Sequence, residues 1–347
     1  MKAIVLHGHG GPEALRFEQV PTPTPGPGDV LVRVHAVSVN RSLDLMVRAG
    51  TYDAQVSFPL VLGVDPSGLV EATGPGVERP KVGDRIAVIS PIRCGQCEFC
   101  RAGNEETCRT NLHVGVHRWG GYAEYVCVPA SNVIPIPDEL SFAEATVITR
   151  HFPTAFHLLL SMAKLEPGEW VLIMGAAGAL GTAAVQVARL IGARIIAAAG
   201  SDERVEATQA NGADYGINYR RQDLAGEVMR ITDGRGVDVV CENIADPTLW
   251  PGAFNSLAFR GRLVTAGAHG GGQVTLDVRR LYHRRLQIIG GPGSTRRDLD
   301  RALEEVRAGR IRAVVDRIMP LREAAVAHRL LEDNSNIGKI ILDPTAS

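Results

Sequence analysis

Four of the six cysteines are concentrated in one short segment, with the spacing Cys94-x2-Cys97-x2-Cys100-x7-Cys108. Four thiolates this close together are the ligand set of a tetrahedral zinc ion with no open position for water or substrate. An iron–sulfur cluster is the alternative, but the seven-residue last gap and the missing Cys-Pro disfavour it. The spacing therefore predicts one structural zinc ion per subunit, bound by Cys94, Cys97, Cys100 and Cys108.

A glycine-rich turn is the second feature with chemical potential. It follows the apolar stretch Trp170–Met174, which is typical of a buried strand, and it leads into a helical pattern. Glycines at this place let backbone N–H groups approach a pyrophosphate at the N-terminus of the helix. A plain tight turn is the alternative. We expect a dinucleotide to be bound by Gly175, Ala177, Gly178, Ala179, Leu180 and Gly181.

Two kinds of pattern along the chain predict two domains in an α/β fold. Up to about residue 150, short apolar runs are separated by turn residues, which is typical of a barrel-like β domain. Between about 151 and 288, apolar strands alternate with helical patterns, which predicts a doubly wound parallel sheet. We expect the tail, 289–347, with helical stretches and a last apolar run, to pack back on the first domain.

The overall composition excludes several classes of partner. The chain has 347 residues, a formal net charge of -1 and no concentrated run of Lys or Arg, so neither nucleic acid nor a membrane surface is expected as a partner. No apolar stretch reaches the ~20 residues of a membrane span, and the start lacks the apolar run of a signal peptide. We expect a cytoplasmic protein that acts on a small molecule.

Further motifs follow one another in a recognisable order. The loop Gly95-Gln96-Cys97-Glu98-Phe99-Cys100-Arg101-Ala102-Gly103 is one, and the others are Gly63 with Gly68, Val82-Gly83-Asp84-Arg85-Ile86, Gly121-Tyr122-Ala123-Glu124-Tyr125 and Gly178-x-x-Gly181. In this order they resemble the medium-chain dehydrogenase/reductase superfamily, over essentially the whole chain. The resemblance implies a GroES-like β-barrel domain (1–150 and 289–347, zinc lobe about 91–112) and a Rossmann domain (151–288). It also implies a cleft between them and a homodimer formed through the strand near Leu286–Ile289.

The end of the second strand of the Rossmann domain indicates which cofactor is bound. An NAD site has an acidic residue there, and the resemblance places Ala199 at that position. Without the acid, Ser201 and Arg204 can donate to a 2′-phosphate, and the resemblance gives Tyr219 a further contact. We therefore expect NADP(H), the alternative being that Arg204 is a solvated helix residue. The resemblance adds, near the nicotinamide end, Thr154, Asn243, Gly267, Ala268 and Lys339.

The ligands of a second, catalytic zinc are missing from the positions that the resemblance assigns to them. The first position holds Arg41 or, with a shift of one residue, Asn40. The second lies in Gly63-Val64-Asp65, and the third holds Arg150. A cation at the third position opposes a bound zinc ion. A replacement site built from His117, His151 or Asp65 is the alternative.

Without that metal, the negative charge that develops on the substrate must be stabilised by hydrogen bonds. The resemblance to the quinone-reductase branch implies that Tyr52 contacts the substrate, and Asn40, Asp44, Arg150 and His151 are further candidates for the cleft. We expect an NADPH-dependent reductase of activated C=C bonds or quinones. The alternatives are an alcohol dehydrogenase or carbonyl reductase without catalytic zinc, and a non-catalytic NADPH-binding protein.

Overall fold

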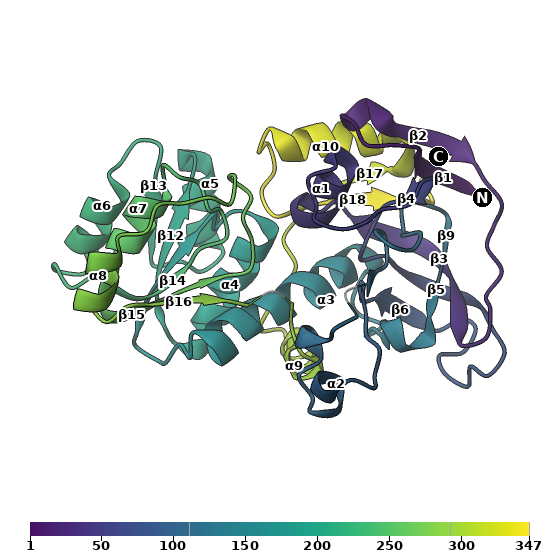
Figure 1. Ribbon diagram of the computed structural model, residues 1–347, viewed down its shortest axis with the longest axis horizontal. Helices are drawn as coiled ribbons and strands as arrows, with labels where there is room; N and C mark the ends of the chain where they lie inside the picture. Colours follow the sequence, from purple (N-terminus) through teal and green to yellow (C-terminus); the bar gives the residue numbers. More distant parts are fainter. Residues whose placement is uncertain (111, 292, 347) are drawn as a thin grey trace. The chain divides into compact units, whose positions relative to one another are not determined.

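The computed structural model describes residues 1–110, 112–291 and 293–346. Its contacts divide the chain into two compact units, which are labelled by element in Figure 1. The first unit comprises Met1–Arg150 and the C-terminal part from Ala313, and the second comprises His151–Arg312. The predicted α/β class, with one barrel-like β unit and one unit built on a parallel sheet, is confirmed.

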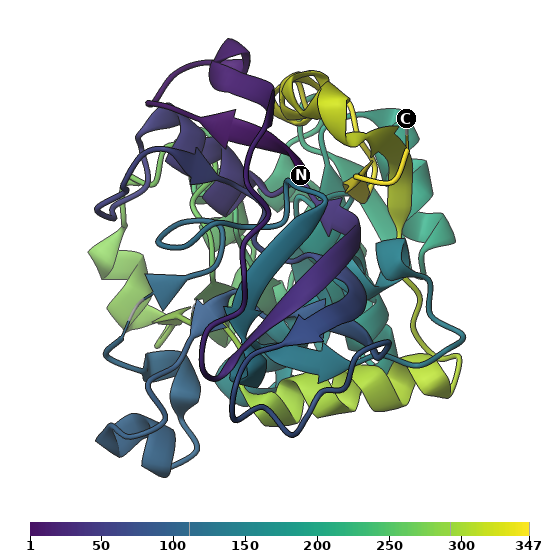
Figure 2. The same ribbon diagram turned by 90° about the vertical axis from the view of Figure 1, so that its right-hand side faces the viewer.

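The first unit is built on a seven-stranded sheet in the order β10-β6-β5-β3-β18-β17, with β9 paired to β3. Its long central strand is β3 (Asp29–Ser38), which Figure 2 shows from the side. The other strands of this sheet are β5 (Ser67–Thr73), β6 (Arg85–Val88), β9 (Tyr125–Pro129), β10 (Val133–Pro135), β17 (Val315–Pro320) and β18 (Lys339–Asp343). The smaller sheets contain β1 (Lys2–Leu6), β2 (Leu15–Gln19), β4 (Leu60–Val61), β7 (Pro91–Ile92) and β8 (Leu112–His113).

Close backbone contact fixes this sheet where β3 pairs with β5. A Cβ added at Gly68 would lie 1.9 Å from the carbonyl oxygen of Arg33, so only glycine fits there. Inward-facing residues such as Val30, Val32 and Val70 join one apolar core with residues of β1 and α10 (Ala324–Glu332). Short helical segments connect the strands: η1 (Pro12–Ala14), η2 (Arg41–Leu45), α1 (Met46–Ala49), α2 (Glu98–Arg101), η3 (Glu105–Thr107), η4 (Ala130–Asn132) and η6 (Leu321–Glu323).

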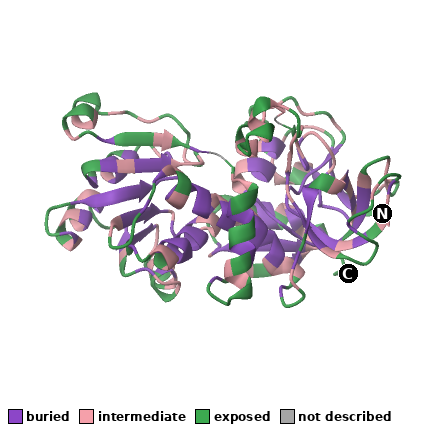
Figure 3. Ribbon diagram, turned by 90° about the horizontal axis from the view of Figure 1, so that it is seen from below, coloured by how far each residue is buried: buried purple, intermediate pink, exposed green. Residues whose placement is uncertain are grey.

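The second unit contains a six-stranded parallel sheet in the order β13-β12-β11-β14-β15-β16. Numbered within the unit, this is the order 3-2-1-4-5-6 of a doubly wound dinucleotide-binding sheet. Its strands are β11 (Trp170–Met174), β12 (Arg194–Ala199), β13 (Tyr215–Asn218), β14 (Val237–Cys241), β15 (Leu257–Thr265) and β16 (Gln287–Gly290). The central strands β11 and β14 are mainly apolar and almost fully buried, and Figure 3 shows the inner strands in the colour of buried residues.

Helices follow the strands of the second unit in the expected alternation. The first is α4 (Ala179–Ile191), which buries Ala184, Val187 and Ala188 and ends at Gly192 in the left-handed conformation. Such an end suits glycine because it has no Cβ to clash. The other helices are η5 (His157–Met162), α5 (Asp202–Ala210), α6 (Leu224–Ile231), α7 (Trp250–Asn255), α8 (Val278–His283) and α9 (Arg296–Arg307), and α3 (Phe142–Phe156) crosses the division between the units.

The position at which the chain returns to the first unit differs from the prediction. We expected everything from residue 289 to pack on the first domain, but the contacts place the division after Arg312. The reason is that β16 pairs with β15, and α9 is tied to η5 by a hydrogen bond of 3.1 Å between Asp298 and His157. From β17 onward the prediction agrees with the structure, since β18 pairs with both β17 and β3.

None of the helices in the described part of the chain is long and apolar enough to cross a membrane.

Candidate functional site

The four predicted zinc ligands come together in one loop of the first unit. Their ligand atoms all lie within 4.8 Å of one another. The Sγ–Sγ distances are 3.5 Å between Cys94 and Cys108, 4.0 Å between Cys94 and Cys100, and 4.0 Å between Cys97 and Cys108. A regular tetrahedron with Zn–S bonds of about 2.3 Å has sulfur atoms about 3.8 Å apart. The cluster therefore has the dimensions of a closed, four-thiolate zinc site.

The backbone of this loop favours thiolates. N–H groups of the loop donate to the sulfur atoms, as from Cys94 to Cys108 at 3.4 Å, and such bonds lower the pKa of Cys94, Cys97 and Cys108. Desolvation and the neighbouring thiols instead raise the pKa of Cys100 to about 12. A fourth thiolate next to three others needs a central cation, which zinc supplies. Among the described residues, no other group of three or more His, Cys, Asp or Glu side chains is arranged to hold a metal ion.

The glycine-rich turn between β11 and α4 provides a cradle for a phosphate. A Cβ added at Gly181 would lie 2.3 Å from the carbonyl oxygen of Gly175, so the turn closes this tightly only with glycine. Gly175 has a φ of +60°, which also favours glycine. Within the described residues, the N–H groups of Ala179, Leu180 and Gly181 have no backbone acceptor. Free N–H groups at a helix N-terminus suit the pyrophosphate of a dinucleotide, so these residues fit the predicted cofactor.

Cations and hydroxyl groups surround the end of β12, where the resemblance places the 2′-position of the cofactor. Ser201 caps α5, because its Oγ accepts a hydrogen bond of 3.4 Å from the N–H of Arg204. A Cβ added at Gly200 would lie 3.0 Å from the Tyr219 hydroxyl and 3.3 Å from Nε of Arg220, so both side chains lie next to Gly200. Sequence reasoning missed Arg220, although it directly follows the predicted Tyr219.

Two acidic residues, Asp202 and Glu203, follow Ser201, and the first of them is occupied by its neighbours. The carboxylate of Asp202 accepts hydrogen bonds from Asn218 at 2.6 Å and from Arg221 at 2.5 Å. These bonds lower the pKa of Asp202. Its negative charge is therefore directed toward Arg221 and partly offset by it.

The other predicted cofactor residues of the second unit lie on two elements. Asn243, just after β14, accepts a hydrogen bond of 2.7 Å from the N–H of Ala266, which ties it to the turn containing Gly267 and Ala268. A Cβ added at Gly267 would lie 3.1 Å from the carbonyl oxygen of Asn243. Thr154 lies half-buried on α3. Asn243, Gly267 and Ala268 thus form one local group, and Thr154 comes from a separate helix.

A buried polar network occupies the first unit where the resemblance expects a catalytic zinc. Asp44 accepts hydrogen bonds from the N–H groups of Asn40 at 2.8 Å and Gly63 at 3.1 Å. Asp65 accepts from Ser38 Oγ at 2.6 Å and from Nδ2 of Asn40 at 3.1 Å. The ammonium of Lys339 donates to Oδ1 of Asn40 at 2.5 Å. Asn40 therefore joins both carboxylates and the lysine.

Asn40 and Arg41, the two candidates for the first ligand position, have different surroundings in the structure. Asn40 has extended backbone angles and is 2% exposed, with its side chain inside the network. Arg41 begins η2 and instead donates to the carbonyl oxygen of Leu331 and to Asn334, at the end of α10. Of the two candidates, Asn40 is therefore the one whose side chain belongs to the buried network.

Burial perturbs the charged groups of the network. Desolvation and the neighbouring Asp65 raise the pKa of Asp44 to about 6, against the hydrogen bonds from Asn40 and Gly63. Desolvation lowers the pKa of Lys339 to about 8, with Asp65 opposing and Arg150 adding to the effect. The charge of Arg150 thus acts on Lys339 inside the same unit.

A second chain of hydrogen bonds supports Asp44. Arg48 Nη1 lies 3.3 Å from Nδ1 of His328, and Nε2 of His328 lies 3.1 Å from the Tyr122 hydroxyl. Because Arg48 can only donate, Nδ1 accepts and the proton of the neutral ring lies on Nε2. Burial keeps the ring neutral, since it lowers the pKa of His328 to about 3. Tyr122 then directs its own O–H toward Asp44. Burial raises the pKa of this tyrosine, and the charges of Asp44 and Asp65 and the hydrogen bond to Asp44 raise it further.

The remaining predicted catalytic residues lie partly in this unit. Burial raises the pKa of Tyr52, while the nearby charge of Arg150 lowers it. The same charge, after desolvation, helps lower the pKa of His113 to about 4. The structure therefore brings Tyr52, Arg150 and the network around Lys339 into electrostatic contact. His151 follows Arg150 on α3 and is half-buried, and the contacts assign it to the second unit.

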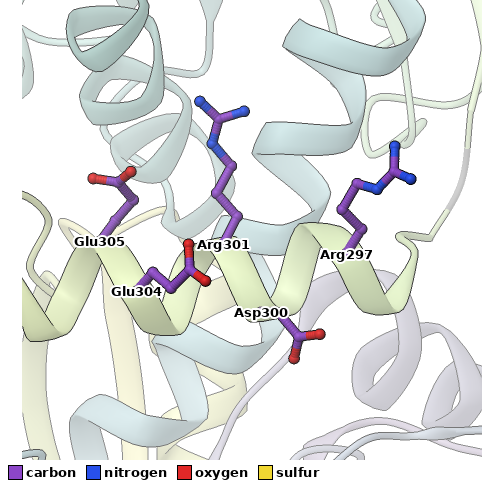
Figure 4. A pocket seen from close by; sticks show the side chains of 5 residues that line it. All are labelled: Arg297, Asp300, Arg301, Glu304 and Glu305. Atoms are coloured by element: carbon purple, nitrogen blue, oxygen red, sulfur yellow. The ribbon is translucent and has the colours of Figure 1, made fainter.

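A hollow on the second unit is unrelated to these residues (Figure 4). It has a volume of about 640 Å³ and is lined by Arg297, Asp300, Arg301, Glu304 and Glu305, all on α9. Two of these side chains are basic and three are acidic, and the lining is mainly polar, so the hollow does not fit an apolar substrate ring.

Comparisons with known proteins agree with these features. Residues 26–138 match the alcohol dehydrogenase GroES-like domain, and residues 179–308 match the zinc-binding dehydrogenase family. An NAD-dependent alcohol dehydrogenase of Sulfolobus acidocaldarius is 34% identical over 99% of this chain and 100% of its own. A 2-haloacrylate reductase of a Burkholderia species is 33% identical (99% and 99%), and the quinone oxidoreductase of Sus scrofa is 30% identical (99% and 97%). A crystal structure of an NAD-dependent alcohol dehydrogenase superposes with a TM-score of 0.94 at 39% identity, covering 99% of both chains.

Proposed function

The chain belongs to the medium-chain dehydrogenase/reductase superfamily and is an oxidoreductase, and we propose which type of reaction it catalyses. We propose that it is an NADPH-dependent reductase that transfers hydride to an activated C=C bond or a quinone without a catalytic metal. Two relatives support this substrate class, one named a quinone oxidoreductase and one a 2-haloacrylate reductase.

The network around Asn40 is the observation that carries the proposal. The three positions assigned to the catalytic zinc hold Asn40, the segment with Asp65, and Arg150. The oxygen atoms of Asp44 and Asp65 accept hydrogen bonds from neighbouring groups, and the Lys339 ammonium lies against Asn40. An ammonium and a guanidinium in this position would repel a divalent ion, and the described residues contain no group of three His, Cys, Asp or Glu ligands here that could hold one. Polarisation of the substrate by hydrogen bonds therefore takes the place of a Lewis acid.

The chemistry of conjugate reduction suits such a site. A bound NADPH supplies the hydride, and the Gly175–Gly181 turn would hold its pyrophosphate. Addition at the β-carbon of an enone, or at a quinone, moves negative charge to an oxygen, which donors can stabilise. Tyr52 and Arg150 are the donors that we assign to this oxygen or to substrate positioning. Asp44 orients the loop that begins at Asn40, through the bonds described above.

The preference for NADPH rests on charge around the end of β12. Ala199 has no carboxylate to repel a 2′-phosphate, and Asp202 is paired with Arg221. Arg204 is at the N-terminal turn of α5, and Tyr219 and Arg220 lie next to Gly200. A guanidinium binds a phosphate in a fixed planar geometry, which favours NADPH over NADH at this place.

One experiment tests both parts of the proposal. The purified protein is assayed for NADPH and NADH oxidation with 2-cyclohexenone, 1,4-benzoquinone and a simple ketone. We expect turnover with the first two acceptors and a lower KM for NADPH than for NADH. Turnover confined to the ketone would contradict the substrate class, and equal KM values would contradict the cofactor preference. Binding of NADPH without turnover of any acceptor would indicate a binding protein.

A second candidate is an alcohol dehydrogenase or carbonyl reductase that works without catalytic zinc. The observation that favours it is the 34% identity to an NAD-dependent alcohol dehydrogenase. This candidate would be established if a primary or secondary alcohol reduced NADP⁺ or NAD⁺ faster than NADPH or NADH reduced an enone.

A further inference from the structure

Lys339 is a buried cation with capacity for a further partner. It is 4% exposed, and its ammonium carries three N–H donors. Among residues 1–110, 112–291 and 293–346, Oδ1 of Asn40 is its one hydrogen-bond partner, and no carboxylate oxygen lies within 4.0 Å of Nζ. A buried charge held by a neutral amide oxygen, with two donors unused, is expensive unless another acceptor is present when the protein works.

Lys339 lies among the residues that the resemblance assigns to the ligand positions of a catalytic zinc. Asn40 occupies the first of the three ligand positions, Asp65 lies beside the second, and Arg150 occupies the third. Lys339 contacts Asn40 directly, and the charges of both Asp65 and Arg150 act on it. The ammonium is thus a positive charge in direct contact with a residue that is a candidate for the first ligand position.

We propose that the Lys339 ammonium is a catalytic group that takes over the electrostatic role of the missing zinc and binds the substrate oxygen on which negative charge develops. The inference rests on the proposed hydride transfer. As hydride from the cofactor forms the new C–H bond at the β-carbon, the π electrons move to the carbonyl oxygen. Lys339 donates a hydrogen bond to that oxygen and keeps its proton. Water supplies the proton that the α-carbon takes up afterwards.

Asn40 and the two carboxylates position the ammonium. The bond to Asn40 Oδ1 fixes one N–H, and Nδ2 of the same amide lies 3.1 Å from Asp65 and 3.3 Å from Asp44. Both acids therefore hold Asn40 in place by hydrogen bonds, and they act on Lys339 through their charges without pairing with it directly. A direct ion pair would neutralise the charge that the substrate oxygen needs.

The test compares Lys339→Met, which removes the charge, with Lys339→Arg, which keeps it. Lys81→Met is the matched control, because Lys81 is exposed in the same unit. We expect Lys339→Met to lower kcat with 2-cyclohexenone about 100-fold, the usual effect of removing one oxyanion donor, with NADPH affinity changed less than about threefold. Lys339→Arg should recover part of kcat. A loss confined to NADPH affinity would show that Lys339 binds a cofactor phosphate instead.

The pH profile is the readout that a purely structural lysine would not move. Desolvation, opposed by the charges of Asp44 and Asp65 and assisted by that of Arg150, brings the pKa of Lys339 to about 8. Wild-type kcat should therefore fall above that pH as the ammonium loses its proton. Lys339→Arg should abolish this fall, because a guanidinium does not titrate there. A fall that persists unchanged in Lys339→Arg would overturn the proposal.

Binding of 4-nitrophenol tests the same inference without turnover, since its phenolate imitates the charged oxygen and absorbs visible light. The protein with bound NADP⁺ should favour the phenolate form, and Lys339→Met should lose this preference. If wild type reduces no enone or quinone but the preference depends on Lys339, the proposed function fails and the ammonium site stands. If wild type turns over and Lys339→Met matches it in both assays, the function stands and the inference fails.

Discussion

The burial of Lys339 has a consequence for stability that is separate from catalysis. Its pKa is about 8 in the folded chain, compared with the ordinary value of 10.5. Each pH unit of difference corresponds to about 1.4 kcal/mol, so the folded state disfavours the charged form by about 3 kcal/mol. Because the folded pKa is depressed for a base, this cost is fully present below pH 8. It decreases as pH rises toward the unfolded value of 10.5 and is gone above it.

The prediction is a difference between two pH dependences. Wild type should gain about 2 to 3 kcal/mol in the free energy of unfolding relative to Lys339→Met between about pH 7 and about pH 10. Less than the full cost is recovered, because the unfolded lysine is still mostly charged at the higher pH. The measurement is urea unfolding of both proteins at both pH values, where all groups shared by the two proteins contribute equally.

Asp44 is the neighbour whose titration lies nearest to this range. Burial raises its pKa to about 6, and the charge of Lys339 opposes this rise. The comparison is therefore repeated with Asp44→Asn in both proteins, which removes that contribution. If the two unfolding free energies change in parallel with pH in both backgrounds, Lys339 is not a buried ammonium with a depressed pKa, and the reasoning is refuted.

Three further outcomes are expected. Elemental analysis should give about one zinc per subunit, and Cys108→Ser should lose it together with thermal stability; two zinc ions, one of them needed for turnover, would restore a metal-dependent reaction. Arg204→Ala and Arg220→Ala should each weaken NADPH by about 1 to 3 kcal/mol and NADH hardly at all, the range for a charged hydrogen bond, and equal losses in kinetics with both cofactors would rule out a 2′-phosphate contact. The chain should be a dimer joined through the edge strand β16, so Ile288→Lys should yield monomers in sedimentation, and a monomeric wild type would remove this expectation.

Local spacing made some of the site predictable. The four cysteines and the Gly175–Gly181 turn each lie within one short segment, so residue types and intervals were enough to anticipate their geometry. The inner strands β11 and β14 were equally evident, because they are short, mainly apolar runs. The unit to which α9 belongs was not evident from the sequence, since its helical pattern contains no information about which unit its buried face contacts.

The polar network could not be derived from spacing, because its members are far apart in the sequence. Lys339 and Asn40 are separated by 299 positions, and Tyr122 and His328 by 206. The choice between Asn40 and Arg41 depended on the single residue at which η2 begins, since neighbouring side chains there point to different surroundings. Sequence indicated that zinc ligands were missing from this region, but the groups that replace them became visible only in three dimensions.

The charges of this region explain why it can be buried without a metal. Lys339 and Arg150 contribute two positive charges, and Asp44 and Asp65 contribute two negative ones, so the group is neutral when all four are ionised. A zinc ion added to it would leave a buried excess of positive charge without a soft ligand to bind it. An oxygen that becomes negative during reaction would instead be stabilised by the two cations, and its charge would disappear once the α-carbon takes up a proton. The same balance that disfavours a resident metal therefore favours a transient anion, which is the state that conjugate hydride transfer produces.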